Sequence, residues 1–110
     1  MMNWIYMKGI SIDAQYLYRK ALEYLRQERY EIAIRYFRQA VLIAPGYSRA
    51  FSAMAYCHAN LGKYDDAIRL YDEAIAINPE NHEARIRRDM VLNLRELRVT
   101  NPQPFMGTLS

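Results

Sequence analysis

The side chains that could act as catalysts or metal ligands in this sequence are few, and their spacing suits neither role. The two histidines, His58 and His82, have no cysteine or carboxylate at a spacing that would place metal ligands on one helix face. Two acidic pairs, at 65–66 and 72–73, fall in stretches with helical periodicity, where such pairs are usually solvated surface residues. The sequence contains no phosphate-binding loop, dinucleotide fingerprint or nucleophile elbow. It therefore predicts a protein that is not an enzyme and uses neither a metal nor another cofactor.

The single cysteine, Cys57, rules out an internal disulfide and is compatible with a reducing compartment. It falls in a helical stretch expected to pack on both sides, which favours an inert core residue over a reactive thiol. The N-terminus lacks the basic region and the cleavage site of a signal peptide. No stretch of the sequence approaches the roughly 20 apolar residues that a membrane span needs. We therefore predict a cytoplasmic protein with no membrane partner.

Arginines are the remaining group that could bind a ligand by charge. The chain carries 15 Lys and Arg against 12 Asp and Glu, a net charge of +3. A local cluster near the C-terminal end comprises Arg85, Arg87, Arg88, Arg95 and Arg98. Acidic residues are interspersed with it and no aromatic platform accompanies it. We expect no nucleic-acid partner, although RNA binding that weakens steeply with salt would revive that alternative.

The elements that must position these residues are revealed by an internal repeat. Shifted by 34 residues, the sequence matches itself, so that one copy spans 14–47 and the next 48–81. The matched pairs are Leu17/Phe51, Ala21/Ala55, Tyr30/Tyr64, Ala33/Ala67, Phe37/Tyr71, Ala40/Ala74, Ile43/Ile77 and Pro45/Pro79. Within each copy the apolar residues recur at helical spacing in two segments, which predicts two amphipathic helices. The paired alanines are expected where neighbouring helices approach closely, and the large pairs where they fill the holes between turns.

Turn and capping residues mark where these helices begin and end. Gly62 can take a left-handed conformation and stop a helix. Each second helix is expected to end just before Pro45 or Pro79, because proline disfavours helix in the residue before it. Asp13 and Asn81 both precede helical runs, which makes them the candidates for N-caps.

This tandem pattern resembles the tetratricopeptide repeat (TPR) family, and the resemblance covers residues 14–98. It implies an all-α fold, a right-handed α-α superhelix of five helices with a possible additional N-terminal segment. The predicted divisions are an apolar N-terminal segment 1–13, repeats 14–47 and 48–81, a capping helix 82–98 and a disordered tail 99–110. The sequence departs from the family pattern at Lys20, Glu28 and His58, where an apolar residue, Gly and Tyr are usual. We therefore expect looser packing on the outer face of the first repeat.

The third unit keeps only its first helix, 82–98. Arg85 and Arg88 stand where the family pattern has large apolar residues, and we expect both to stay solvated. The side chains expected to pack on the preceding repeat are Ala84, Ile86, Met90, Val91, Leu94 and Leu97. One apolar face and one charged face are what a capping helix needs to close an array.

In this family the first helix of each repeat lines a concave groove that binds peptides. The resemblance places in that groove Tyr18, Leu22, Leu25, Arg49, Ser52, Tyr56, Asn60, Ile86, Arg87, Met90 and Asn93. Such a face suits an amphipathic helix or an extended apolar peptide, and Tyr and Arg often dominate binding energy. The resemblance thus implies a non-catalytic adaptor or scaffold that binds another protein. For Leu22, Leu25 and Met90 the alternative is core packing, because apolar stripes at helical spacing are usually core.

One TPR subclass grips the C-terminal carboxylate of chaperones with two Lys, two Asn and an Arg. The matching positions in this chain are Tyr18, Leu22, Ala53, Glu83 and Arg87. Only Arg87 fits, and Glu83 would place a negative charge beside the carboxylate. We therefore expect an apolar peptide as the ligand.

The segment before the repeats carries the apolar side chains Trp4, Ile5, Tyr6 and Met7. Exposed apolar patches commonly mark interfaces, so we predict that these residues mediate a homodimer. The alternatives are that the segment occupies its own groove, covers the first repeat or is disordered. A purely structural repeat that assembles with copies of itself is the corresponding alternative function.

Overall fold

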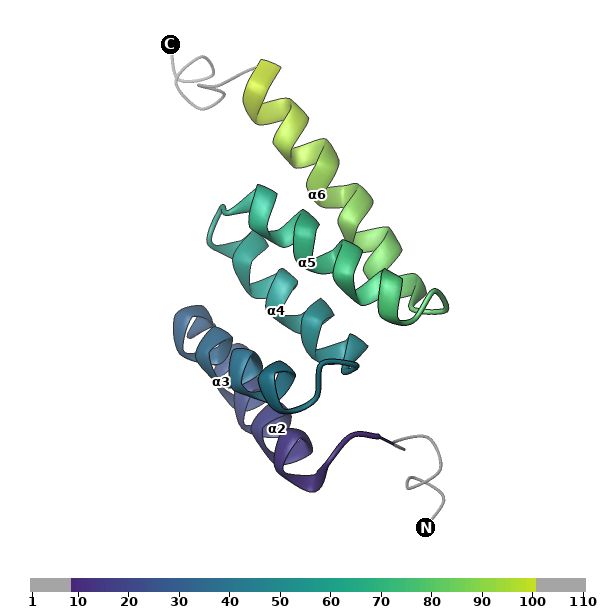
Figure 1. The fold of residues 1–110 in the computed structure, drawn as a ribbon. Helices are drawn as coiled ribbons and strands as arrows, with labels where there is room; N and C mark the ends of the chain where they lie inside the picture. The colour runs from purple at the N-terminus through teal and green to yellow at the C-terminus, as the bar shows by residue number, and fades with distance from the viewer. Residues whose placement is uncertain (1–8, 101–110) are drawn as a thin grey trace.

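The computed structural model describes residues 9–100, with side chains described as far as Val99. Within that range the chain is all-α and forms five helices. They are α2 (Ile12–Arg26), α3 (Tyr30–Ile43), α4 (Ser48–Asn60), α5 (Tyr64–Ile77) and α6 (His82–Thr100). Helices α2 and α3 form one hairpin, α4 and α5 form the next, and α6 packs along α5 (Figure 1). The predicted all-α tandem repeat is confirmed.

Of the two N-caps predicted from the sequence, the structure confirms one and contradicts the other. Asn81 caps α6, because its side-chain oxygen accepts a hydrogen bond from the backbone N–H of Ala84 at 3.2 Å. The prediction that Asp13 caps the first helix is wrong. Ser11 does so, accepting from the N–H of Ala14 at 3.2 Å. Asp13 lies in the first turn, where its charge favours the positive end of the helix.

The turns inside the two hairpins share one backbone geometry. Gly62 has φ +78° and the equivalent Glu28 has φ +60°. In each turn the following N–H reaches back to a carbonyl five residues earlier, Arg29 to Tyr24 and Lys63 to His58, both at 2.9 Å. This is the hydrogen-bond pattern of an α-helix that ends at a residue in the left-handed conformation. Helices α3 and α5 end at Ile43 and Ile77, as the prolines two residues later predicted.

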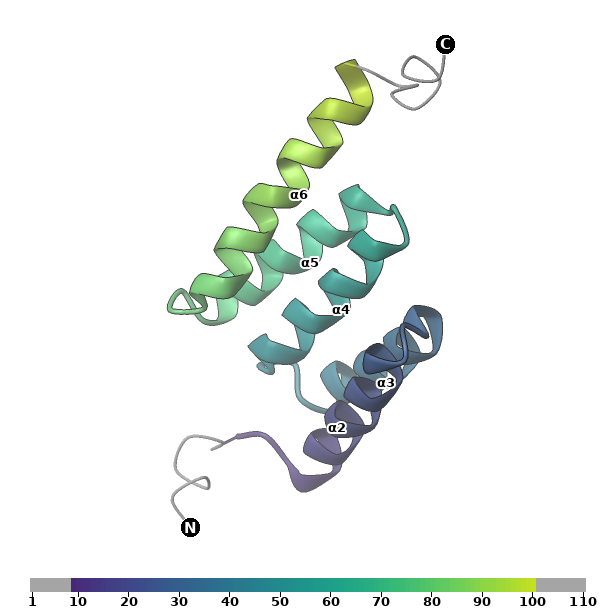
Figure 2. The same ribbon diagram turned by 180° about the vertical axis from the view of Figure 1, so that it is seen from behind.

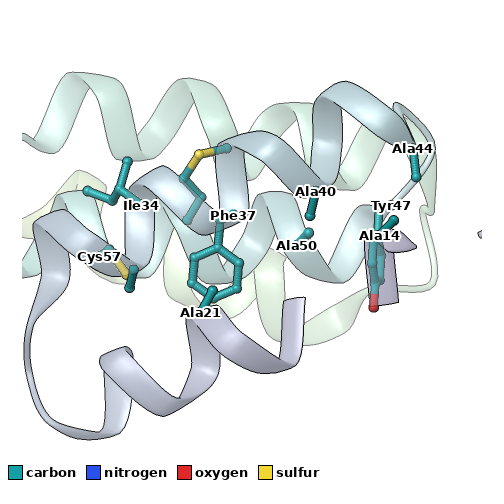
Figure 3. Packing of buried hydrophobic residues seen from close by; sticks show 11 residues of the cluster. Ala14, Ala21, Ile34, Phe37, Ala40, Ala44, Tyr47, Ala50 and Cys57 are labelled. Atoms are coloured by element: carbon teal, nitrogen blue, oxygen red, sulfur yellow. The ribbon is translucent and has the colours of Figure 1, made fainter. Parts of the chain in front are cut away.

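The core consists of the paired small and large residues of the repeat. All six of the predicted close-approach alanines are fully buried: Ala21, Ala33, Ala40, Ala55, Ala67 and Ala74. Phe37 and Tyr71 fill the spaces between them at 0% and 1% exposure. Figure 3 shows the Phe37 ring next to Ala21, with Ala40 beside Ala50. The helices therefore approach closely because their contact faces carry almost no side-chain bulk.

A small polar network joins the starts of α4 and α6 to the end of α5. The buried Ser48 hydroxyl donates to the carbonyl of Ala74 at 2.8 Å. The Asn81 side-chain amide donates to the hydroxyl of Ser48 at 3.0 Å and more weakly to that of Ser52 at 3.4 Å. Because Asn81 also caps α6, this network fixes where α6 begins relative to α4.

The packing of α6 differs from the prediction. Only Ala84 and Val91, of the six side chains expected to pack on the preceding repeat, are buried. The other four are exposed and form an apolar stripe along α6, hereafter the α6 stripe: Ile86, Met90, Leu94 and Leu97.

Arginine side chains take the place of those apolar residues against the α4–α5 hairpin. Arg88, which was expected to stay solvated, is partly buried and pairs with Asp72 at 2.9 Å, while Arg85 is exposed. Arg95 pairs with Asp65 at 2.9 Å. Long aliphatic stems let arginine cover apolar surface while its charged end finds a partner, so a charged face of α6 can face α5.

The two ends of the predicted domain are only partly described. Helix α6 continues through Val99 and Thr100, so the predicted tail begins two residues too early, and 101–110 lie outside the described residues. The C-terminal end of α6 projects beyond the α4–α5 hairpin in both views (Figures 1 and 2). The four residues predicted to mediate self-association also lie outside the described range: Trp4, Ile5, Tyr6 and Met7.

Candidate functional site

A cavity of about 350 Å³ opens between α2, α4 and the start of α6. Its lining consists of Tyr18, Leu22 and Leu25 from α2, Arg49, Ser52, Ala53 and Tyr56 from α4, and Asn81, Glu83 and Arg87 at the start of α6. We call this cavity the groove. Helices α2, α4 and α6 all contribute to it, and α3 and α5 connect them, because α3 packs against both α2 and α4, and α5 against both α4 and α6.

Seven of the eleven side chains predicted for the groove line it: Tyr18, Leu22, Leu25, Arg49, Ser52, Tyr56 and Arg87. The other four do not. Asn60 donates from its side-chain amide to the carbonyl of Tyr56 at 2.9 Å, so it bonds to its own helix. Ile86, Met90 and Asn93 are exposed on α6 beyond the cavity.

Three lining residues were absent from the predicted set: Ala53, Asn81 and Glu83. Ala53 and Glu83 are two of the positions that the resemblance matches to the carboxylate-binding pattern, and that match is the signal that could have added them to the predicted set. Asn81 enters the groove through its bond to Ser52, a partner 29 residues away that no local pattern shows.

The apolar residues of the groove are also part of the core. Tyr18, Leu22 and Leu25 are partly buried and pack against the first hydrophobic cluster. The Tyr18 ring lies 5.7 Å from the ring centre of Phe37 and 5.0 Å from that of Tyr47. Leu22 and Leu25 therefore pack on the core and also line the groove, so the two alternatives considered for them are not exclusive. A floor tied to the core in this way is held rigidly.

An arginine lies over each groove tyrosine. The Arg49 guanidinium is 5.8 Å from the ring centre of Tyr18, and that of Arg87 is 5.0 Å from the ring centre of Tyr56. Both distances are in the range of cation–π attraction. These contacts hold two flexible cations at the groove surface, which reduces the entropy lost when a ligand contacts them.

The two arginines differ in their charge partners. Arg87 pairs with Glu83, with 3.0 Å between Nε and Oε2. Arg49 has no acidic partner among the described side chains, and it is exposed at the first turn of α4. The groove is therefore positive on the Arg49 side and close to neutral on the Arg87 side.

Burial keeps two ionisable groups of the core, Tyr47 and Cys57, in their neutral forms. Burial raises the pKa of Tyr47 to about 12, so its hydroxyl stays protonated beside Tyr18. Burial also raises the pKa of the Cys57 thiol to about 12. A thiol with such a pKa carries almost no thiolate at neutral pH, as expected of an inert core cysteine.

Three of the four acidic residues at 65–66 and 72–73 form ion pairs with arginines. Asp65 and Asp72 pair with arginines of α6, and Asp66 pairs with Arg69 in its own helix at 3.0 Å. Among residues 9–99 no group of three or more His, Cys, Asp or Glu side chains is placed to hold a metal ion. None of the helices described is both long enough and apolar enough to span a bilayer.

Comparison with known proteins agrees with this architecture. The family model for the tetratricopeptide repeat matches residues 18–82. The chain is also 29% identical over 90 residues to the "DnaJ homolog subfamily C member 7 homolog" of Dictyostelium discoideum. That alignment covers 80% of this chain and 17% of the relative, so the chain spans about a sixth of the relative's length. The family match covers more than half of the chain, and the protein belongs to the tetratricopeptide repeat family.

Proposed function

We propose that this protein is a non-catalytic adaptor that holds a segment of a partner polypeptide in the groove. Repeats of this family mediate protein–protein interaction, and the cavity between α2, α4 and α6 offers a concave, partly apolar surface. The observation that carries the proposal is the pairing of Tyr18 with Arg49 and of Tyr56 with Arg87 on that surface. Tyr and Arg are the side chains that most often dominate binding energy.

The chemistry of the groove favours an apolar segment over a chaperone C-terminal carboxylate. Tyr18, Leu22 and Leu25 supply an apolar floor. Glu83 holds Arg87 at 3.0 Å, so the one residue that matches the carboxylate-binding pattern already has a negative partner. A terminal carboxylate at that position would have to displace Glu83 or lie beside its charge.

A longer partner segment would continue from the groove onto α6. Ile86 and Met90 are 62% and 56% exposed and flank Arg87 on the same helix. Asn93 follows them one turn later and is also exposed. We propose that these three side chains extend the binding surface. Because they lie outside the cavity, they would contribute less energy than the desolvated groove tyrosines.

The structure offers little support for nucleic-acid binding through the arginines of α6. Arg88 and Arg95 pair with aspartates of α5. Arg98 donates to the carbonyl of Gly62 at 3.2 Å and lies 4.4 Å from the ring centre of Tyr64. These partners compete with phosphate for the guanidinium groups, so a protein partner is the better proposal. The free, buried Cys57 suits the cytoplasm, where we place the protein.

Self-assembly is the second candidate function, and the α6 stripe is what favours it. Exposed apolar patches commonly mark interfaces, and this helix exposes Ile86, Met90, Leu94 and Leu97. Light scattering on a sizing column would give the mass of the wild-type chain and of a Met90→Glu variant. A wild-type dimer that the variant converts to a monomer would support self-assembly through α6. A dimer unchanged by the variant would direct attention to Trp4, Ile5, Tyr6 and Met7.

A matched pair of tyrosine variants tests the groove. Tyr56 lines the groove, whereas Tyr16 is 54% exposed on α2 outside it. Peptides selected from a random library would be measured by fluorescence anisotropy against Tyr56→Ala and Tyr16→Ala. We expect Tyr56→Ala to weaken binding by tenfold or more, on the order of a hot-spot loss, and Tyr16→Ala to leave it unchanged. Equal affinities for the two variants would contradict the proposed site.

A further inference from the structure

We propose that the groove selects partner segments carrying an Asp or Glu side chain next to apolar residues, and that this carboxylate pairs with Arg49. The inference rests on the proposed function and adds the chemistry of the segment that the groove prefers. It concerns an acidic residue inside a segment, because the position that would suit a chain terminus is held by the Arg87–Glu83 pair.

Arg49 is the cation of the groove that is available to a ligand. Its guanidinium lines the cavity and lies over the Tyr18 ring, and it has no acidic partner among the described side chains. Most cations of a protein surface can reorient freely, but the ring contact holds this one at the cavity edge. A ligand carboxylate would therefore meet a positioned donor able to make charge-assisted hydrogen bonds.

The surroundings of Arg49 add to its positive charge. Burial raises the pKa of Tyr47, and the charges of Arg49 and Arg19 act in the opposite direction, so both guanidinium groups are within electrostatic reach of its hydroxyl. The first turn of α4 contains no acidic residue, and its N-cap makes no side-chain hydrogen bond. The positive end of the helix dipole is thus not compensated by a side chain on this helix. No described acidic side chain forms an ion pair with Arg49 or Arg19 that would offset this potential.

The Glu83–Arg87 pair sets the direction of the segment. Glu83 lines the cavity beside Arg87 and would repel a second carboxylate there. The apolar floor of Tyr18, Leu22 and Leu25 lines the same cavity. The preferred segment therefore places its acidic residue at Arg49 and neutral, apolar residues toward Arg87.

A phage-displayed library of random 12-residue peptides provides the probe. The inserts are fused through their C-terminal ends, so no insert carries a free C-terminal carboxylate, and any acidic preference comes from side chains. The library is selected in parallel on the wild-type protein, Arg49→Gln and Arg35→Gln. Arg35 is the matched control because it is exposed on α3, outside the groove, and has no ion pair among the described residues. Circular dichroism melts verify that all three proteins are folded.

We expect Asp or Glu beside aromatic or aliphatic residues to be enriched on the wild type and on Arg35→Gln, and not on Arg49→Gln. In a selected peptide, replacing the acid by its amide should weaken binding to the wild type about tenfold and binding to Arg49→Gln hardly at all. An equal loss with both proteins would overturn the pairing with Arg49 while leaving groove binding intact. A library that yields no sequence sensitive to Tyr56→Ala would overturn the pairing and the proposed function together.

Discussion

The two hairpins and the last helix are held in the fold by different kinds of contact. Helices α2 to α5 meet through fully buried alanines with Phe37 and Tyr71 between them. Among its described side chains, helix α6 fully buries Ala84 and Val91, and two arginine pairs with α5 leave 37% or less of each arginine side chain exposed. Close apolar packing is insensitive to salt, whereas partly exposed ion pairs are individually weak and screened.

This difference matters for the groove, because the groove spans both regions. Its α2 and α4 walls belong to the tightly packed hairpins, whereas Glu83 and Arg87 belong to α6. The hairpins thus supply a rigid apolar floor. The α6 wall is anchored at its start by the Asn81 network and by polar contacts along its length. We expect the hairpins to set the stability of the fold and α6 to set the shape of the groove.

The largest expected effect comes from breaking the packed region. Phe37 is fully buried between the helices of the first hairpin and its neighbour. Phe37→Ala should lower the free energy of unfolding by about 3–5 kcal/mol, because it removes a large apolar side chain and leaves a cavity. Urea unfolding followed by circular dichroism measures this loss. A loss below about 1 kcal/mol would mean that the core does not depend on this ring.

A smaller effect is expected at the two equivalent turns, one of which contacts α6. Glu28 adopts φ +60°, so Glu28→Gly should stabilise the protein by about 1 kcal/mol by relieving a conformation that L residues rarely adopt. Gly62→Ala should destabilise it by a similar amount, since Gly62 has φ +78° and an added Cβ would lie 3.4 Å from Arg98 of α6. Thermal melts measure the change in stability of each variant. Changes of the same sign in both variants would contradict the shared turn geometry.

The packing of α6 on α5 should be more sensitive to the loss of an ion pair than to a change in side-chain volume. Arg88→Gln removes the pair with Asp72, and we expect it to lower the stability of α6 by less than about 1 kcal/mol. Hydrogen exchange should show faster exchange of α6 amides in the variant, and in the wild type at high salt, with α2 to α5 unchanged. Arg69→Gln is the control, because Arg69 pairs with Asp66 within one helix and this pair does not connect two helices. Equal effects of the two variants would argue against a polar attachment.

The smallest effect concerns a polar group inside the hairpins. Burial lowers the pKa of His58 below its ordinary 6.5, and its Nδ1 is buried without a hydrogen-bond partner. The folded state therefore favours the neutral ring, and the unfolded chain binds a proton more readily. The neutral His58 ring therefore contributes fully to the free energy of unfolding above pH 6.5. This contribution is lost as the pH falls through 6.5 toward the folded-state pKa. Urea unfolding at pH 7.5 and 5.5 should show the loss in the wild type and a smaller one in His58→Tyr.

The hairpins were predictable from the sequence because their determinants are local and repeated. The 34-residue spacing predicted the alanine contacts, Gly62 predicted one turn, and the prolines predicted two helix ends. The groove residues on the first helices were placed there by the family resemblance, which assigns Tyr18, Tyr56 and Arg87 to the concave face.

The packing of α6 was not predictable because this helix carries two candidate faces. One face presents Ile86, Met90 and Leu94, and the sequence pattern alone favours burying it. The face that packs instead is chosen by Asp72 and Asp65, which lie 16 and 30 residues from their arginine partners. Local periodicity contains no information on such distant charge pairs.

The most direct test of the proposed groove is a map of where a selected peptide touches the protein. Amide shifts of the labelled protein would be recorded by NMR as the peptide is added. Binding in the groove predicts the largest changes around Tyr18, Arg49, Tyr56 and Arg87, with α3 and residues 94–100 of α6 little affected. Changes centred on α3, or confined to the far end of α6, would contradict the proposal that the groove is the binding site.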